Sequence, residues 1–135
     1  MKLEDAKILV VEDSLGMQAY VVHLLKRLNV QTIEVCANGR QALQLVKSFM
    51  PDVILSDIHM APMDGFEFLR KLRELAPNPS RHRTPLIYLS MDASMEALST
   101  AIAQGAAAYI VKPPRSEVLR DKLEQALNGP TRHAF

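Results

Sequence analysis

The chain has 135 residues, which fits one domain at roughly 150 residues per domain. Its 16 Lys and Arg nearly balance its 15 Asp and Glu, so long-range attraction to nucleic acid or anionic membranes is excluded. One cysteine excludes an internal disulfide. The first six residues are charged and lack the apolar region of a signal peptide, and no apolar run reaches the roughly 18 residues of a membrane span. We expect a cytoplasmic protein without a membrane partner.

Five short apolar runs, rich in β-branched residues, predict strands. They cover residues 8–11, 33–35, 53–55, 86–89 and 109–111. Four of the runs are apolar throughout, as expected for strands of a parallel sheet that is covered on both faces. The run 33–35 contains Glu34, so we expect it at an edge of the sheet. Cys36 follows this run and is expected to be a small buried residue.

Longer segments between these runs place apolar or small residues three or four positions apart, the spacing of a helix face. The faces are Met17, Val21, Leu24 and Leu28; Ala42, Leu45 and Phe49; Phe66, Leu69 and Leu72; Ala97, Ala101 and Gln104; and Leu119, Leu123 and Ala126. The expected N-caps are Ser14, Asn38, Asp64, Asp92 and Ser116. The expected stop signals are Pro51, Pro77 and Gly105.

Strands that alternate with helices predict an α/β fold with right-handed crossovers. We expect a doubly wound, flavodoxin-like sheet of five parallel strands in the order 2-1-3-4-5, with five helices on both faces. The domain should cover residues 1–127, leaving 128–135 as a short tail and no output domain. The segment 77–85 contains Arg81, His82 and Arg83 and is expected to be a solvated basic loop.

Polar side chains follow four of the predicted strands. They are Glu12 and Asp13, Ser56 and Asp57, Ser90, and Lys112. Ligands of such sheets bind beyond the carboxyl ends of the strands, so these side chains fall in one site, with Asp57 at its centre. Taken singly, each has a plain structural explanation as a helix cap, a strand end or a turn. Their joint placement on one edge favours a functional site.

Three neighbouring carboxylates repel one another, by about 4 kcal/mol per pair at ~4 Å and an effective dielectric near 20. Either one of them takes up a proton or a cation binds, and a hard divalent ion, Mg²⁺ in particular, suits such a cluster. The cation and Lys112 would together attract a dianionic phosphoryl group. A carboxylate such as Asp57 is a competent phosphoryl acceptor, and the Ser90 hydroxyl would donate to the phosphoryl oxygens.

At these residues the chain resembles the receiver domain of two-component response regulators, over residues 7 to about 127. The resemblance rests on motifs in the family's order and spacing: Val10-Val11-Glu12-Asp13-Ser14, the segment 51–57, Met63-Asp64-Gly65, Leu89-Ser90, and the segment 105–113. Each motif alone is weak, but together they are specific. A single-domain regulator of the chemotaxis type is the closest description, and a receiver cut from a larger regulator or hybrid kinase is the alternative.

The resemblance implies a phosphoacceptor and a metal site. Asp57 resembles the acceptor, which takes a phosphoryl group from a histidine kinase or a phosphotransfer protein. Asp13 and Asp57 resemble the carboxylate ligands of Mg²⁺. Glu12 would act mainly through a bound water, and the backbone carbonyl of His59 would be a further ligand.

The resemblance also implies a switch. Ser90 resembles the hydroxyl that moves toward the phosphoryl group, and Tyr109 the aromatic residue that then turns inward. Lys112 would contact the phosphoryl oxygens, and Pro113 would follow a cis peptide bond. The face formed by the fourth helix, fifth strand and fifth helix would then change its affinity for a downstream protein or for a second copy of the chain, without direct DNA binding.

Three places depart from the family pattern. The segment after the acceptor reads Met60-Ala61-Pro62-Met63, with the proline one place late, so we expect an altered loop with both methionines packed beneath it. Met91 stands where Ala or Gly is usual and is expected to narrow access to Asp57. His59 and Asp92 occupy positions that influence how long the phosphoryl group persists.

Two other functions use the same residues. A Mg²⁺-dependent phosphohydrolase of haloacid dehalogenase type would want a second acid two positions after the nucleophile, where this chain has His59. A receiver-like module that never carries phosphate would have no need of all five polar residues. We therefore expect no enzyme activity beyond self-catalysed phosphorylation and dephosphorylation of Asp57.

Overall fold

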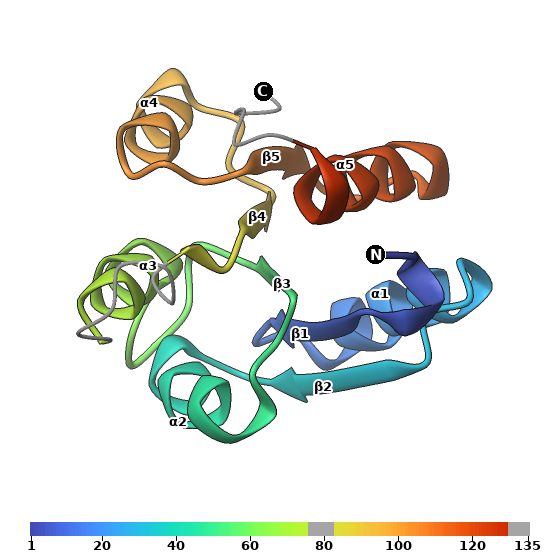
Figure 1. The fold of residues 1–135 in the computed structure, drawn as a ribbon. Coiled ribbons are helices and arrows are strands. Elements are labelled where there is room, and N and C mark those ends of the chain that lie inside the picture. The colour runs from blue at the N-terminus through green and yellow to red at the C-terminus, as the bar shows by residue number, and fades with distance from the viewer. Residues whose placement is uncertain (76–82, 130–135) are drawn as a thin grey trace.

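The computed structural model describes residues 1–75 and 83–129. The elements in chain order are a short 3-10 helix η1 (Leu3–Asp5), β1 (Lys7–Val11), α1 (Leu15–Arg27), β2 (Thr32–Cys36), α2 (Gly39–Phe49), β3 (Val53–Ser56), α3 (Gly65–Glu74), β4 (Leu86–Ser90), α4 (Met95–Ala103), β5 (Ala108–Val111) and α5 (Ser116–Asn128). The strands form one parallel sheet in the order β2-β1-β3-β4-β5. The predicted fold class and strand order are confirmed. Figure 1 shows α1 and α5 on one side of the sheet and α2, α3 and α4 on the other.

Each strand coincides with a predicted apolar run and extends it by no more than one residue at either end. Strand β2 is at the edge and is partly exposed, as expected for the run that contains Glu34. The register pairs Val11 with Ser56 and Ser90 with Val111. Neighbouring strands therefore end at nearly the same level, which brings the residues that follow them to one edge of the sheet.

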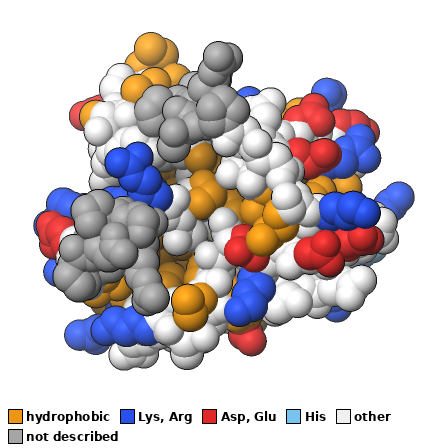
Figure 2. Space-filling model, viewed as in Figure 1, with side chains coloured by type: hydrophobic (Ala, Val, Ile, Leu, Met, Phe, Trp, Pro, Cys, Tyr) orange, Lys and Arg blue, Asp and Glu red, His pale blue; other side chains and the backbone are white. Residues whose placement is uncertain are grey.

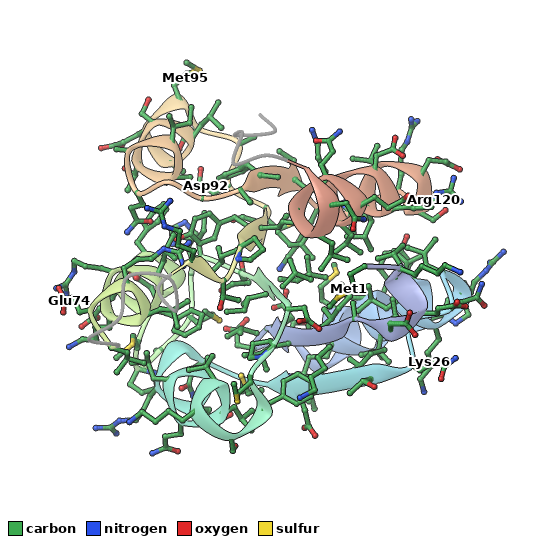
Figure 3. All side chains as sticks on the ribbon, in the orientation of Figure 1. Met1, Lys26, Glu74, Asp92, Met95 and Arg120 are labelled. Atoms are coloured by element: carbon green, nitrogen blue, oxygen red, sulfur yellow. The ribbon has the colours of Figure 1, made fainter. Side chains whose placement is uncertain are left out.

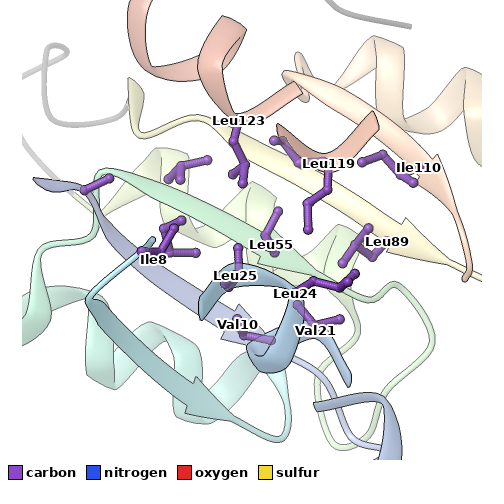
Figure 4. Close-up of a cluster of buried hydrophobic side chains, with 14 of the residues drawn as sticks. Ile8, Val10, Val21, Leu24, Leu25, Leu55, Leu89, Ile110, Leu119 and Leu123 are labelled. Carbon is purple, nitrogen blue, oxygen red and sulfur yellow. The ribbon is translucent and has the colours of Figure 1, made fainter. Parts of the chain in front are cut away.

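Alternate residues of β1, β3, β4 and β5 pack on opposite faces of the sheet, as the two-residue period of a strand requires. One face joins Ile8, Val10, Leu55, Leu89 and Ile110 to the inner sides of α1 and α5 (Figure 4). The other face joins Leu9, Val11, Ile54, Leu86 and Tyr88 to α2, α3 and α4. Helices cover both faces of the sheet with apolar side chains. The carboxyl edge of the sheet is therefore the place where polar side chains can come together.

Three of the predicted N-caps are confirmed. The side chains of Ser14, Asn38 and Asp64 each accept a hydrogen bond from the backbone N–H three residues later. Such a bond satisfies one of the N–H groups that the first helical turn leaves unpaired. These caps fix where α1, α2 and α3 begin, just beyond the strand ends that form the site.

The N-caps predicted at Asp92 and Ser116 are wrong. Helix α4 is capped by Ser94, whose Oγ accepts from the N–H of Ala97 at 3.1 Å. The Asp92 carboxylate instead accepts from the N–H of Ser94 at 2.9 Å, in a turn two residues before the helix. Ser116 is the first residue inside α5, and Arg115 takes the cap position without a side-chain bond.

The helix ends follow the expected stop signals where the structure describes them. Met50 adopts a positive φ of 52° before Pro51, and Gly105 adopts 78° after α4, the left-handed conformation of residues that terminate a helix. Helix α5 ends at Asn128, one residue beyond the expected limit of the domain. The stop predicted at Pro77, most of the expected basic loop and most of the tail lie outside the described residues, although Arg83 is exposed. Within residues 1–75 and 83–129, no helix is long and apolar enough to cross a membrane.

Candidate functional site

Three carboxylates meet at the carboxyl edge of the sheet, as the sequence predicted. Glu12 and Asp13 follow β1 and Asp57 follows β3, and one oxygen from each lies within 4.8 Å of the others. Glu12 and Asp57 are buried and Asp13 is exposed. Oxygen ligands in a partly open cluster are the donors that Mg²⁺ prefers, with room for the waters it retains. The residues present therefore fit a divalent cation.

Lys112 lies between two of these carboxylates. Its Nζ is 3.2 Å from Asp57 Oδ2 and forms an ion pair with Glu12 Oε1. All three side chains are at least nine-tenths buried. Burial raises the pKa of Glu12, and the hydrogen bond from Lys112 opposes that rise. The lysine thus provides the positive charge that keeps two carboxylates together in a buried place.

The backbone at Asp57 and Ile58 is held from both sides. We call these two residues the acceptor segment, after the role that the resemblance implies for Asp57. The N–H of Asp57 donates to the carbonyl of Val11 at 2.9 Å, and Asp57 Oδ1 accepts from the N–H of Ile58 at 2.8 Å. On the other side, a Cβ on Gly65 would lie 2.2 Å from the Asp57 carbonyl oxygen. The close approach of α3 therefore requires glycine at position 65 and fixes where Asp57 stands.

The β4–α4 connection (residues 91–94) brings Ser90 and Tyr109 to a single residue, Asp92. The Asp92 N–H donates to Ser90 Oγ at 3.1 Å, and the Tyr109 hydroxyl donates to the Asp92 carbonyl. Burial raises the pKa of the half-buried Tyr109 phenol. Ser90 and Tyr109, the hydroxyl and the aromatic residue that the resemblance singled out, are therefore both hydrogen-bonded to the backbone of Asp92.

Asp92 also contacts His59, in the loop that follows Asp57. His59 Nε2 lies 2.8 Å from Asp92 Oδ2, with 67% of the His59 side chain and 26% of the Asp92 side chain exposed. The hydrogen bond with His59 is the main reason why the pKa of Asp92 is lowered to about 2. Figure 3 labels Asp92 below α4, in the connection from β4. The sequence placed both residues beside the site but did not predict their contact.

The remaining predicted positions surround these groups. The Lys112–Pro113 peptide bond is cis, as expected, and so is Ala61–Pro62 in the altered loop. Met60 is buried and Met63 is partly buried against the same core cluster. Met91 is 73% exposed. The shielding of Asp57 by Met91 and the use of the His59 carbonyl as a ligand stay predictions.

Sequence reasoning missed a buried polar network behind the site. The hydroxyl of Tyr88, which is fully buried, donates to Gln104 Oε1 at 2.8 Å. The sequence pattern places Gln104 on a helix face and Tyr88 in an apolar strand. A signal was present, because a tyrosine inside a buried strand needs a partner for its hydroxyl. The sequence did not identify which residue that partner is.

Comparisons with known proteins agree with this geometry. A family model described as the response regulator receiver domain matches residues 8–124. The chain is 30% identical over 124 residues to the transcriptional regulatory protein YdfI of Bacillus subtilis, covering 91% of this chain and 55% of YdfI. It is 31% identical over 127 residues to the transcriptional regulatory protein ZraR of Escherichia coli K12, covering 94% of this chain and 27% of ZraR. The chain thus spans about half or less of these curated relatives.

Solved structures with the same fold include two of similar length. The chemotaxis response regulator CheY4 of Vibrio cholerae superposes with a TM-score of 0.78 at 35% identity, over 90% of this chain and 98% of CheY4. The signal receiver domain of a histidine kinase from Syntrophus aciditrophicus gives 0.80 at 31% identity, over 94% of this chain and 93% of that domain. The family match covers the sheet from Ile8 of β1 onward and the whole carboxylate cluster, and the chain belongs to the response regulator receiver domains of two-component systems.

Proposed function

We propose that Asp57 accepts a phosphoryl group from a histidine kinase or a phosphotransfer protein, in a Mg²⁺-dependent reaction. The observation that carries this proposal is the environment of the Asp57 carboxylate. One of its oxygens lies within 4.8 Å of an oxygen of Glu12 and of Asp13, and its Oδ2 is 3.2 Å from Lys112 Nζ. A carboxylate with a purely structural role at the surface would not need the buried lysine and the two acidic neighbours that surround Asp57.

Each side chain then has a chemical task. Glu12, Asp13 and Asp57 would hold the cation, which supplies positive charge that offsets the negative charge of the entering group. Asp57 provides the attacking oxygen, and Lys112 balances the charge on the phosphoryl oxygens through its ammonium group. Ser90 donates its hydroxyl to one of those oxygens once it leaves the Asp92 N–H.

Phosphorylation would alter the surface near α4. The phosphoryl group adds strong acceptor oxygens and about one further negative charge. When Ser90 turns toward it, the contacts of Asp92 with Ser90 and Tyr109 rearrange. We propose that the α4–β5–α5 face, which exposes Met95, Ile102, Val111 and Val118, then binds a downstream protein. Met95 projects outward from α4 in Figure 3, where Figure 2 shows exposed hydrophobic atoms.

The test is a phosphorylation assay with Mg²⁺ and acetyl phosphate, followed by intact mass. We expect the native protein to gain one phosphoryl group and Asp57→Asn to gain none. Asp52→Asn, a change of charge near the opposite edge of the sheet, is the matched control and should be phosphorylated like the native protein. Labelling of Asp57→Asn at the native rate would refute the acceptor assignment.

We propose no turnover of external phosphomonoesters. Position 59, where haloacid dehalogenase chemistry wants an acid, carries a histidine that is paired with Asp92. Sustained release of phosphate from a phosphomonoester, at a rate abolished in Asp57→Asn, would show that this part of the proposal is wrong.

A further inference from the structure

Helix α4 has little apolar anchoring. Its buried side chains are Ala97 and Ala101, whereas its neighbour α3 buries Phe68, Leu69 and Leu72. Packing free energy scales with the apolar area that is buried. The position of α4 on the sheet therefore depends more than that of α3 on the polar contacts at its two ends.

The C-terminal end of α4 is bonded to the first turn of α3. Gln104, the C-cap residue, accepts from the Tyr88 hydroxyl at 2.8 Å through Oε1 and donates to the Phe66 carbonyl at 2.8 Å through Nε2. The Tyr88 hydroxyl also lies 3.1 Å from the Gly65 carbonyl. Figure 1 shows α3 and α4 on the same side of the sheet. One amide side chain thus bonds α4 to α3 through its Nε2 and to strand β4 through its Oε1.

The first turn of α3 is in turn fixed to the acceptor segment. The Gly65 N–H donates to the Ile58 carbonyl at 2.7 Å, and the close approach at Gly65 leaves no space for a Cβ beside the Asp57 carbonyl. Contacts therefore run without interruption from Asp57 through Gly65 to Gln104.

The N-terminal end of α4 is held by different groups. Asp92 contacts Ser90, Tyr109 and His59, and two of these three are residues that the proposed function sets in motion. Tyr88 and Gln104 are not among those residues. The two ends of α4 are therefore held by different groups. The N-terminal end is bonded to residues of the site, and the C-terminal end is bonded to Tyr88 in β4 and to the first turn of α3.

We propose that Gln104 is a positioning residue that fixes the C-terminal end of α4 to α3, so that α4 turns about this end when its N-terminal end is released. The turning rests on the proposed function, because phosphorylation provides the release. The anchor itself does not rest on it, since all of its contacts are present without a phosphoryl group.

The anchor is tested first, without phosphodonor, by hydrogen exchange with peptide resolution. Gln104→Leu removes both bonds at similar side-chain length, and Tyr88→Phe removes one. We expect exchange in residues 100–106 to accelerate roughly fivefold to tenfold in Tyr88→Phe, the effect of losing one net hydrogen bond, and to accelerate more in Gln104→Leu, while exchange in α1 stays unchanged in both. Gln44→Leu, on the exposed side of α2, is the matched control. No acceleration, or an equal acceleration in α1 and α4, would overturn the anchor.

The turning is tested by repeating the measurement with Mg²⁺ and acetyl phosphate. In the native protein we expect exchange to change in residues 91–98 and to stay constant in residues 100–106. In Gln104→Leu the change should spread to residues 100–106. An equal change in both segments of the native protein would overturn the turning. If intact mass shows no phosphorylation, the proposed function and the turning both fail, and the first experiment alone decides on the anchor.

Discussion

Asp92 connects more parts of the site than any single motif suggested. Its N–H, its carbonyl and its carboxylate contact Ser90, Tyr109 and His59 respectively. The resemblance to receiver domains implied that Asp92 lies beside the site, at a position that influences how long the phosphoryl group persists. The pairing with His59 depends on the conformation of two loops, which local sequence patterns do not specify.

The His59 contact predicts how Asp92 titrates. The folded-state pKa of about 2 lies below the ordinary value of 3.8, so the contribution of Asp92 to stability is present above pH 3.8 and is lost as the pH falls toward 2. His59→Ala should raise the pKa of Asp92 toward 3.8, as measured by NMR of the carboxyl carbon. His23→Ala, on the exposed surface of α1, should leave it in place. An unchanged midpoint in His59→Ala would contradict the pairing.

The buried lysine should matter far more than an exposed ion pair. Lys112→Met leaves Glu12 and Asp57 buried without their cation, and the free energy of unfolding at pH 7 should fall by about 3 kcal/mol. Arg120→Met breaks the exposed Arg120–Glu124 pair and should cost less than about 0.5 kcal/mol. Because burial raises the pKa of Glu12 above its ordinary value of 4.5 and Lys112 opposes that rise, Glu12 in Lys112→Met should take up its proton already above pH 4.5, and the loss should shrink as the pH falls toward that value. Urea unfolding at several pH values checks both points; equal losses in the two variants would contradict the account.

At the scale of elements, the contact of α3 with the acceptor segment predicts a contrast between two glycines. A Cβ on Gly65 would meet the Asp57 carbonyl oxygen at 2.2 Å, whereas a Cβ on Gly16 in α1 meets nothing within 4 Å. Gly65→Ala should lower the free energy of unfolding by about 2 kcal/mol through overpacking. Gly16→Ala should raise it by about 0.5 kcal/mol through helix propensity. Denaturant unfolding measures both, and a neutral Gly65→Ala would show that the contact is not tight.

The elements themselves were largely predictable from the sequence. Apolar runs located the strands to within one residue at each end. Four of the five runs are continuous, because a strand covered on both faces has no polar position to blur its limits, and the edge strand β2 was found from the apolar residues on either side of Glu34. Caps were less certain where several candidates stood together. In the segment 92–94 both Asp92 and Ser94 are good N-cap residues. The Asp92 carboxylate pairs with His59 and Ser94 caps the helix, and local sequence does not specify such a tertiary contact.

At the scale of the whole molecule, the strand order brings together residues that are far apart in the chain. Glu12 and Lys112 are 100 positions apart and form a buried pair, which follows from the sheet order together with the position of each residue just after a strand. The edge of the sheet was therefore predictable. The partners across it were not, because side-chain pairing depends on packing detail such as the Tyr88–Gln104 bond.

The carboxylate cluster predicts that Mg²⁺ stabilises the folded protein. A ligand that binds the folded state alone at ten times its Kd adds about 1.4 kcal/mol to the free energy of unfolding. We expect Mg²⁺ to raise the Tm of the native protein, and to raise it much less in Asp13→Asn, which lacks one ligand. Asp121→Asn on α5 is the matched control and should respond like the native protein. Identical responses in all three proteins would contradict a site at Glu12, Asp13 and Asp57.

The central claim is that Asp57, among the three clustered carboxylates, forms the acyl phosphate. Borohydride reduces an acyl phosphate to an alcohol, so a phosphorylated aspartate becomes homoserine. The protein should be treated with acetyl phosphate and Mg²⁺, reduced with borohydride, digested and sequenced by mass spectrometry. We predict homoserine at position 57 and unmodified side chains at Glu12 and Asp13. Reduction at either of those positions, or at none of the three, would contradict the account.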